Sequence, residues 1–300
     1  MRFQSVIRQI EVPLNENKLS RLLEEALFED LGMGDITTEA TVSPDAIGRG
    51  EFLVKETGVV AGLGTIQGVF HLIDDDLQMK SFVEDGSLVE SGTIVGVVDG
   101  SLASILKAER TALNILQRMS GIATLTRAFV EAVRGTRAKI IDTRKTAPGL
   151  RILDKLAVTM GGGMNHRFGL DDMVLIKDNH ITAAGSVRGA IGKCTAYLAD
   201  RKLQLAVEVE TKSIGQVREA LAQTGIHRIM LDNFPIEEMR TAVELINHVV
   251  EVEASGNVSL ATVRAIAETG VDFISVGALT HSPKALDISL KINPQSVHTH

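Results

Sequence analysis

Polar and charged residues follow the short apolar runs in the C-terminal half of the sequence, at the point where each run ends. Six such runs have the length and composition of buried strands, and they read KIIDT, MVLIKDN, LAVEVE, RIMLDN, EVEAS and FISVGAL. In a barrel of parallel strands the carboxyl ends meet at one face, and active sites lie on that face. We therefore expect the residues at these ends to converge.

Cations come from the first run ends, carboxylates from the next ones and small residues from the last ones. The converging residues are Asp142, Thr143, Arg144, Lys145, Lys177, Asp178, Asn179, Glu208, Glu210, Asp232, Asn233, Glu253, Ala254, Ser255, Gly256, Ser275, Val276, Gly277 and Ala278. A cationic wall opposite an acidic one suits an anionic substrate that binds with a divalent ion. Magnesium fits Glu210 and Asp232, because proteins hold it through one or two carboxylates together with substrate phosphates.

Glu208 and Glu210 lie on the same side of their candidate strand, since side chains alternate along a strand. In a barrel both face either the interior or the surrounding helices. Inward carboxylates need cations, which leaves two interpretations: a structural layer of ion pairs, or a part of the substrate site. The convergence of six run ends favours the second interpretation.

Small residues at the last two run ends predict phosphate sites. Ser255 with Gly256, and Gly277 with Ala278, leave backbone N–H groups accessible just before a helix or helical turn, and such ends bind phosphate. Turns also use Ser and Gly for their geometry alone, so each loop by itself is weak evidence. His281, beyond the second loop, is placed to donate to the same phosphate.

The glycine-rich segment GGGMNHRFGLDD carries His166 and Arg167. Glycine lets the backbone pass close to a ligand. His166 and His180 have no neighbours at the short spacings typical of metal ligands, so we do not expect them to bind a metal. The planar guanidinium of Arg167 matches carboxylates, and the compact ammonium of Lys177 suits phosphates. The mixed cluster favours a substrate that carries both groups.

The elements that must position these residues are predicted by hydrophobic periodicity. From residue 139 onward the apolar runs alternate with amphipathic segments, which predicts parallel βα units. Six strands are fewer than the eight of a complete TIM barrel, so we expect an incomplete α/β barrel rather than a doubly wound sheet. No Gly-x-Gly-x-x-Gly follows a candidate strand, and the glycine run at 161–163 lacks the rest of a Walker motif.

The N-terminal part follows a different pattern. A helix is predicted over residues 19–31, and short β-rich pieces punctuated by glycine between residues 50 and 100 predict a small, mainly antiparallel sheet. We place the domain boundary after residue 117. This gives an N-terminal domain over 1–117 and a C-terminal domain over 118–300.

A second helix is predicted over residues 102–118, and two charges break its apolar stripe. Glu109 falls within the stripe and Arg110 on its edge. A snorkelling Arg beside a solvated or paired Glu would explain both charges without any function. From position alone this interpretation and a functional one stay open.

Composition excludes several classes of protein. The chain has 300 residues, of which 44% are hydrophobic, so it can bury a sizeable core. A net charge of −7, with one Tyr and no Trp, argues against a nucleic-acid surface. No run approaches the ~18 apolar residues of a membrane span, and the stretch MRFQSVIRQIEVPLNENK lacks a signal-peptide core. The single Cys194 cannot form an intrachain disulfide. We expect a cytoplasmic protein without nucleic-acid or membrane partners.

Eight segments occur in the order typical of quinolinate phosphoribosyltransferases. They read AERTALNILQRMSGIAT, IIDTRKTAPGLR, GGGMNHRFGL, VLIKDNH, VEVET, MLDNF, VEASGNV and SVGALTHS. The sequence resembles this family from LFEDLGMGDITTEA to the final candidate strand. The resemblance implies an N-terminal open-faced α/β sandwich followed by an incomplete TIM-like α/β barrel. It also implies a homodimer in which the sandwich of one chain covers the barrel of the other; assembly of dimers into hexamers stays open.

The resemblance further implies transfer of the phosphoribosyl group of phosphoribosyl pyrophosphate to quinolinate. Carbon dioxide and pyrophosphate leave, and the product is nicotinate mononucleotide in de novo NAD biosynthesis. The residues implied around the two carboxylates of quinolinate are Arg144, His166, Arg167 and Lys177, with Arg110 from the partner chain. The implied catalytic residues are Lys145 and Lys177, facing phosphoribosyl pyrophosphate, and Glu210 and Asp232, facing its ribose hydroxyls and Mg²⁺. The residues implied at the 5′-phosphate are Ser255, Gly256, Asn257, Gly277, Ala278 and His281, and Thr143 and Val276 complete the substrate-binding set.

Three other functions compete with this one. A paralogous pyrophosphorylase for another aromatic acid would keep the phosphoribosyl site and change the carboxylate cage, which the presence of Arg144 and Arg167 opposes. A non-catalytic sensor of phosphoribosyl ligands would tolerate the loss of Glu210 and Asp232. A barrel aldolase would use Lys177 as a Schiff base, whereas the phosphoribosyl transfer needs no covalent intermediate on the protein.

Overall fold

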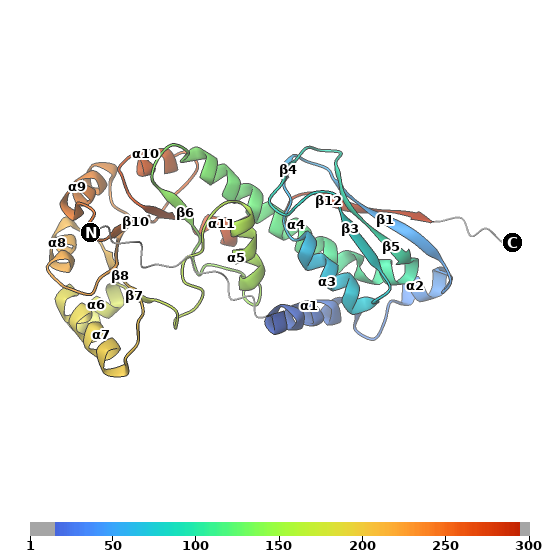
Figure 1. Cartoon of the computed structure of the whole chain (residues 1–300), viewed down its shortest axis with the longest axis horizontal. Helices are drawn as coiled ribbons and strands as arrows, with labels where there is room; N and C mark the ends of the chain where they lie inside the picture. Colours follow the sequence, from blue (N-terminus) through green and yellow to red (C-terminus); the bar gives the residue numbers. More distant parts are fainter. Residues whose placement is uncertain (1–15, 295–300) are drawn as a thin grey trace. The chain divides into compact units, whose positions relative to one another are not determined.

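The computed structural model describes residues 16–294 (Figure 1). The N-terminal stretch MRFQSVIRQIEVPLNENK, for which no signal peptide is predicted, lies mostly outside the described residues. The described chain forms two compact units. The first comprises Ala128–Lys145 and Gly163–Ala278, and the second comprises the described residues up to Arg127, Thr146–Gly162 and those from Leu279 on. A domain boundary after residue 117 stays a prediction. No helix among the described residues combines the length and apolar character of a membrane span.

The first unit is built on a parallel sheet with the strand order β6-β11-β10-β9-β8-β7. Its strands are β6 (Lys139–Ile141), β7 (Val174–Ile176), β8 (Val207–Thr211), β9 (Arg228–Asp232), β10 (Glu251–Ser255) and β11 (Phe273–Ser275). β6 and β7 are edge strands, so this sheet of the described chain curves without closing into a ring (Figure 1). The predicted incomplete α/β barrel is confirmed, and all six predicted apolar runs contain its strands.

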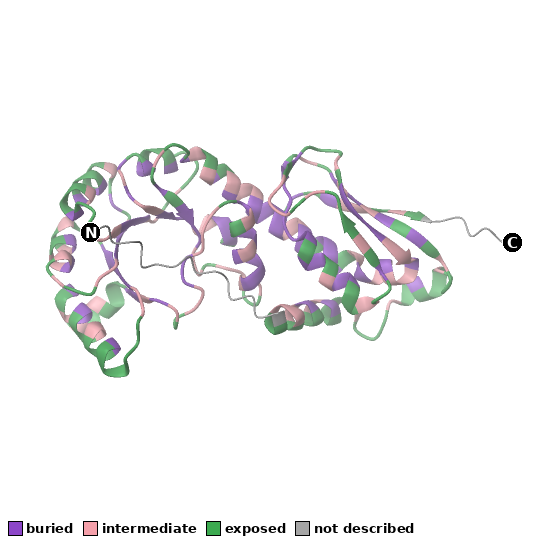
Figure 2. Cartoon of the chain, viewed as in Figure 1, coloured by how far each residue is buried: buried purple, intermediate pink, exposed green. Residues whose placement is uncertain are grey.

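Helices alternate with these strands and lie on the outside of the curved sheet (Figure 1). They are α6 (Asp178–Ala184), α7 (Val187–Arg201), α8 (Ile214–Leu221), α9 (Ile236–Ile246) and α10 (Val263–Ala267). The hydroxyls of Ser186 and Ser213 cap α7 and α8 by accepting backbone N–H groups. α9 stops at Asn247, which adopts the left-handed conformation with a φ of 43°. Because the helices cover the outside of the sheet, the strands are largely buried and the outer helix faces are exposed (Figure 2).

The second unit contains an antiparallel sheet with the strand order β12-β1-β5-β3. Its strands are β1 (Ile47–Val54), β3 (Gln78–Ser81), β5 (Ile94–Ser101) and β12 (Ile288–Pro294), and β2 (Gly58–Val59) pairs separately with β4 (Leu88–Val89). Every second residue of β1 is buried, as expected for a sheet with one covered face. The predicted antiparallel sheet is confirmed. β12 lies outside the predicted segment, since it joins the edge of β1 from the far end of the sequence.

Helices complete the second unit, and some of them cover one face of its sheet (Figure 1). The helices are α1 (Glu16–Leu31), α2 (Ile36–Thr41), α3 (Leu63–Ile73), α5 (Arg151–Met160) and most of α4 (Leu102–Ala132), and the short α11 (Ala278–His281) begins where the chain returns to this unit. Phe52 of β1 packs edge-to-face against Phe70 of α3, with ring centroids 5.9 Å apart. The predicted open-faced sandwich is confirmed, and the helix predicted over 102–118 continues to Ala132.

Close packing of α4 generates a testable prediction at Gly121. A Cβ at this position would lie 2.1 Å from the carbonyl oxygen of Lys284. Alanine is favoured over glycine inside a helix by about 1 kcal/mol, but here we expect Gly121→Ala to lower the free energy of unfolding by about 1–3 kcal/mol through overpacking. Gly192 in α7 is the matched control, since an added Cβ meets no atom within 4 Å. Denaturant unfolding followed by circular dichroism should show destabilisation for Gly121→Ala and slight stabilisation for Gly192→Ala; stabilisation of both would contradict the contact.

Candidate active site

The carboxyl ends of the parallel strands bring the predicted acidic residues to one edge of the sheet in the first unit. Glu210 lies near the end of β8, Asp232 ends β9 and Ser255 ends β10. Asp232 is opposite Ser255 in the parallel register. Glu210 is opposite Met230, two residues before Asp232. The edge therefore places the two carboxylates beside the first of the predicted phosphate turns.

An ion pair joins the cationic and acidic groups at this edge. The ammonium Nζ of Lys177, at the start of α6, lies 2.9 Å from Oε2 of Glu210. A second lysine, Lys212, lies 2.6 Å from Asp178. The bond to Asp178, together with the negative charges of Asp232 and Glu210, raises the pKa of Lys212. Lys212 was not among the predicted site residues, because it follows the end of β8 in a polar stretch without a distinctive pattern.

Two guanidinium groups lie near each other where an anion would neutralise both. The Nε of Arg144 is buried and has no hydrogen-bond partner among residues 16–294. Arg167 is buried and donates from Nη1 to the carbonyl oxygen of Met173, at 3.0 Å. Burial, and then the charge of Arg144, lowers the pKa of Arg167. A buried donor without a partner needs an explanation, and paired guanidinium forks fit the geometry of carboxylates. The arrangement is suited to an anionic ligand with carboxylate groups.

The loop after β6 is tied to the glycine-rich segment. Asp142 is completely buried, and its Oδ1 accepts the backbone N–H of His166 at 2.8 Å. Thr143 accepts the backbone N–H of Lys145 at 3.0 Å, and the side chain of Lys145 is exposed. The two predicted cationic segments are thus held together by a buried carboxylate.

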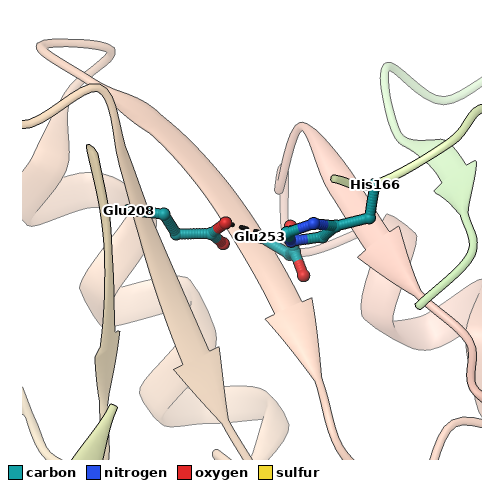
Figure 3. Close-up of side chains that lie close together, drawn as sticks. All are labelled: His166, Glu208 and Glu253. Carbon is teal, nitrogen blue, oxygen red and sulfur yellow. Dashed lines mark ion pairs between the residues drawn. The ribbon is translucent and has the colours of Figure 1, made fainter. Parts of the chain in front are cut away.

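His166 turns its ring toward two buried carboxylates (Figure 3). Its Nε2 lies 3.0 Å from Oε2 of Glu208 and 3.6 Å from Oε2 of Glu253. Its Nδ1 accepts the backbone N–H of Arg167 at 2.7 Å. Both ring nitrogens therefore face groups of the protein, and contact of this ring with a substrate carboxylate stays a prediction.

Arg228 of β9 neutralises part of this buried acid. Its Nη1 lies 2.9 Å from Oε2 of Glu253, and its Nη2 lies 3.1 Å from Oε2 of Glu251. The interpretation as a structural layer of ion pairs therefore describes Glu208, and a place of Glu210 in the substrate site stays a prediction. Glu208 belongs to an interior layer of ion pairs, whereas Glu210 faces Lys177 at the edge of the sheet.

The interior carboxylates titrate abnormally. Burial, and then repulsion from Glu208, raises the pKa of Glu253 to about 7. Burial acts in the same direction on Glu208, but the charge and contact of His166 together with the charge of Arg228 outweigh it and lower the pKa of Glu208. Burial opposes a charged imidazole, yet Glu253 and Glu208 raise the pKa of His166. Because Nδ1 accepts the backbone N–H of Arg167, the hydrogen of the neutral ring lies on Nε2.

The same three side chains have the spacing of metal ligands. One ligand atom each from His166, Glu208 and Glu253 lies within 4.8 Å of the others. The sequence does not reveal this cluster, because the three residues come from separate segments. Arg228 and a proton already supply positive charge to it, so ion pairing accounts for the arrangement.

The turn after β10 is locked to the end of β9. Asn233, Gly256 and Asn257 have φ angles of 57°, 97° and 50°. The amide of Asn257 donates to Oδ1 of Asn233 at 3.0 Å, and the amide of Asn233 donates to Asp232 at 3.1 Å. A Cβ on Gly256 would lie 2.2 Å from Oδ1 of Asn233. Only glycine fits this turn, and its role as a phosphate site stays a prediction.

The second predicted phosphate turn follows β11. The backbone N–H of Val276 donates to the carbonyl oxygen of Ile141 at 2.9 Å and so continues the pairing with β6. Gly277 and Ala278 are partly exposed, and α11 begins at Ala278. Their contact with phosphate stays a prediction.

Two predicted site residues belong to the second unit. Arg110 is exposed on α4, and its charge opposes the effect of burial, which raises the pKa of the neighbouring Glu109. His281 is exposed, with Nδ1 2.6 Å from the hydroxyl of Ser282. Their roles in the active site stay predictions.

A buried clamp in the second unit was not predicted. The guanidinium of Arg118 makes two bonds of 2.8 Å with the fully buried carboxylate of Asp154. Asp154 also accepts the backbone N–H of Ala147, and Arg118 donates to the carbonyl oxygen of Thr280. The clamp fixes the chain that follows the loop after β6. The pairing of Arg118 with Asp154 is not evident from the sequence, because each charge lies inside a helical segment.

An open parallel barrel with buried guanidinium groups, a Lys–Glu pair and small-residue turns at its carboxyl edge is typical of α/β enzymes for anionic substrates. The family model described as quinolinate phosphoribosyl transferase, C-terminal domain, matches residues 122–291, and the model of the N-terminal domain matches residues 35–120. The chain belongs to the quinolinate phosphoribosyl transferase family.

Known relatives agree with this assignment. The chain is 49% identical over 292 residues to quinolinate phosphoribosyltransferase [decarboxylating] 1b of Nicotiana tabacum, covering 92% of this chain and 83% of that protein. A probable nicotinate-nucleotide pyrophosphorylase [carboxylating] of Synechocystis is 45% identical, with 90% and 91% covered. The crystal structure of NadC from Streptococcus pyogenes is 40% identical with a TM-score of 0.89, and the match covers 94% of this chain and 99% of that one.

The interior proton predicts how stability depends on pH. The pKa of Glu253 is raised to about 7 and that of His166 is also raised, so the folded chain binds more protons than the unfolded chain between pH 5 and 8. Stability must then fall as pH rises through this range. We expect this loss of stability to lower the melting temperature by roughly 5 °C between pH 5 and 8, since each 1 kcal/mol of unfolding free energy corresponds to about 2–4 °C.

The variant Glu253→Gln isolates this effect, because its neutral side chain imitates protonated Glu253. Its melting temperature should vary less between pH 5 and 8 than that of the wild type. Glu251→Gln removes a carboxylate from the same Arg228 without touching His166, and should keep the wild-type dependence. Equal slopes for the wild type and Glu253→Gln in differential scanning fluorimetry would contradict the assignment.

Proposed function

We propose that this protein is a decarboxylating quinolinate phosphoribosyltransferase, which converts quinolinate and phosphoribosyl pyrophosphate to nicotinate mononucleotide, pyrophosphate and carbon dioxide. The observation that carries the proposal is the pair of neighbouring guanidinium groups of Arg144 and Arg167, one with a buried donor that no protein group accepts. A pyridine dicarboxylate supplies the acceptors that such groups match. The names of the relatives state the same substrate.

In this proposal the cations divide between the two substrates. Arg144, Arg167 and Lys177 bind the carboxylates of quinolinate, together with His166 and with Arg110 of a second chain. Lys145 and Lys177 approach the pyrophosphate group. The turns after β10 and β11 bind the 5′-phosphate through backbone N–H groups, which suits their small residues and partly exposed main chain.

Glu210 and Asp232 would hold Mg²⁺ together with the ribose hydroxyls. The fit rests on their chemistry and placement: two carboxylates at adjacent strand ends offer the hard oxygen donors that this ion prefers. When bound, magnesium would neutralise charge on the departing pyrophosphate. The pair of Lys177 with Glu210 places a cation of the protein beside the same group.

The reaction needs orientation and charge stabilisation from the protein rather than a nucleophile. Pyrophosphate leaves C1 of the ribose with its bonding electrons, and the lysines stabilise the negative charge that develops on it. The pyridine nitrogen, held by the arginine contacts to the carboxylates, forms the new bond to C1. When the 2-carboxylate departs as carbon dioxide, the electron pair of the broken bond stays on C2, where the adjacent positive ring nitrogen stabilises it, and C2 then takes up a proton from water.

The contact of Lys177 argues against the aldolase alternative. An amine must lose its proton to form a Schiff base. Nζ of Lys177 lies 2.9 Å from Oε2 of Glu210, and a Schiff base on this nitrogen would break the ion pair. A paralogue for another aromatic acid and a non-catalytic sensor are distinguished by the assay below.

The proposal includes a homodimer with shared active sites, and assembly into hexamers is compatible with it. Arg110 is exposed on α4 and therefore accessible to a second chain. The second unit also exposes the large apolar side chains of Phe28, Met33 and Ile36, a pattern that favours protein contacts.

We place the protein in the cytoplasm on the basis of its single cysteine, although some plant relatives are named mitochondrial or chloroplastic. Cell fractionation tests this location.

A substrate assay tests the function. Purified protein with Mg²⁺ and phosphoribosyl pyrophosphate should convert quinolinate to nicotinate mononucleotide and release one carbon dioxide per product. Nicotinate, which lacks the 2-carboxylate, should give little or no product. Arg144→Ala and Arg167→Ala should each lower kcat/KM for quinolinate by about 100-fold or more, the equivalent of about 3 kcal/mol. Product from nicotinate at a similar rate would refute the specificity, and binding without turnover of any pyridine acid would favour the sensor.

Subunit exchange tests the shared site. Arg110→Ala and Lys177→Ala should each be inactive alone, because each removes one group from every site. After denaturation and mixing, about a quarter of wild-type activity should return, since half of the dimers are mixed and each carries one intact site. Lys177→Ala mixed with Arg144→Ala is the control, because both residues belong to one barrel and no intact site can form. Equal recovery in both mixtures would contradict the shared site.

A further inference from the structure

Four ionisable side chains form a layer inside the parallel sheet of the first unit: Glu208, Glu253, Arg228 and His166. The proposed reaction gives this layer as a whole no role. Glu208 and Glu253 have no exposed surface, and within the described part of the chain Oε1 of each carboxylate accepts no hydrogen bond. Buried ion pairs are often replaced by apolar side chains without loss of stability. Stability alone therefore does not explain two carboxylates at this position.

His166 connects this layer to the cationic side of the active site. Its backbone N–H donates to Asp142, and its Nε2 lies 3.0 Å from Glu208. With the ring fixed in this way, Nδ1 accepts the backbone N–H of Arg167 at 2.7 Å. A rotation of the imidazole would break that bond. The orientation of the ring thus determines where the chain carries Arg167.

Arg167 is also the group that most needs such support. Its guanidinium is buried, donates to the carbonyl oxygen of Met173 at 3.0 Å, and lies near the like charge of Arg144. Repulsion between the two guanidinium groups favours a movement of Arg167 away from Arg144. The negative charge of Glu208 acts on Arg167 in the opposite sense. The carboxylate of Glu208 beneath the site therefore helps to keep Arg167 in place before the substrate arrives.

We propose that Glu208 and Glu253 are positioning residues for the carboxylate-binding cations: acting through the ring of His166, they hold the main chain at Arg167 and keep its guanidinium aimed at the anionic substrate. Glu208 makes the direct contact with Nε2. Glu253 closes the other side of the ring and is itself held by Arg228 at 2.9 Å. This inference rests on the proposed function for the identity of the substrate, quinolinate.

Kinetics of Glu208→Leu separate positioning from a general loss of structure. Leucine fills a similar volume but cannot bind Nε2, so KM for quinolinate should rise at least about tenfold while KM for phosphoribosyl pyrophosphate stays within about twofold. Glu208→Gln should recover most of the quinolinate affinity, because its amide oxygen still accepts from Nε2–H. Glu251→Gln is the matched control, since Glu251 binds Arg228 but not His166, and it should change neither KM. Melting temperatures establish that each variant is folded.

A spectroscopic measurement on the unmodified protein tests the geometry without relying on activity or on the folding of Glu208→Leu. In protein with ¹⁵N-labelled imidazole at pH 8, the His166 signals, assigned by their loss in His166→Gln, should show a protonated Nε2 and an unprotonated Nδ1 that accepts a hydrogen bond. In Glu208→Leu the Nδ1 signal should move, and in Glu251→Gln it should not. A protonated Nδ1 in the wild type would overturn the proposal even if Glu208→Leu fails to fold.

Other outcomes also decide the matter. Equal increases of both KM values in folded Glu208→Leu, or no increase in either, would overturn the proposal. One equivalent of a metal ion that is present in the wild type and absent from Glu208→Leu would overturn it too, because the three side chains would then be ligands. If the wild type makes no product from quinolinate, the proposed function fails, whereas the nitrogen spectrum still determines whether the ring holds Arg167.

Discussion

Compensation of buried charge is the constraint on which the rest of the structure depends. A site for an anionic substrate needs cations in place before the substrate arrives, and Arg167 is buried close to a second guanidinium group. A protein interior tolerates such groups only when opposite charge is near. Glu208 provides part of that charge from inside the sheet and Asp172 provides more. Arg228 balances the buried pair of Glu208 and Glu253. Their full burial and the abnormal pKa of Glu253 follow from this arrangement.

The parallel sheet makes the arrangement possible, because it sorts residues by depth. Side chains alternate along β8, so Glu208 and Glu210 share a face but differ in height by two residues. The deeper carboxylate meets His166, and the outer one meets Lys177. The turn after β10 then needs glycine at position 256, since Asn233 fills the space where a Cβ would lie. The residue type needed at the end of one strand therefore depends on the side chains of the neighbouring strand.

Hydrophobic patterning predicted the six parallel strands and the antiparallel sheet, because each depends on residues close together in the sequence. It did not predict β12, whose partner β1 lies at the opposite end of the chain. The pairing of Arg118 with Asp154 and the cluster around His166 were missed for the same reason. Arg144, Lys177 and Glu210 were predicted as site residues because each lies at or just after the end of an apolar run. Which groups contact one another depended on register and depth, which a single sequence does not encode locally.

Exposure separates the permanent ion pairs of the site from those that a substrate can replace. The pair of Arg228 with Glu253 has side-chain exposures of 5% and 0%, and removing one partner of such a pair leaves an uncompensated charge that costs about 3–5 kcal/mol. Lys177 is 46% exposed, and pairs with a solvated partner contribute about 0–1 kcal/mol. A phosphate that approaches the edge therefore competes with Glu210 for Lys177 at little cost, but it cannot compete for Arg228. The interior pairs keep their geometry through a catalytic cycle, and the edge pair is free to exchange partners, as transfer between two anionic substrates requires.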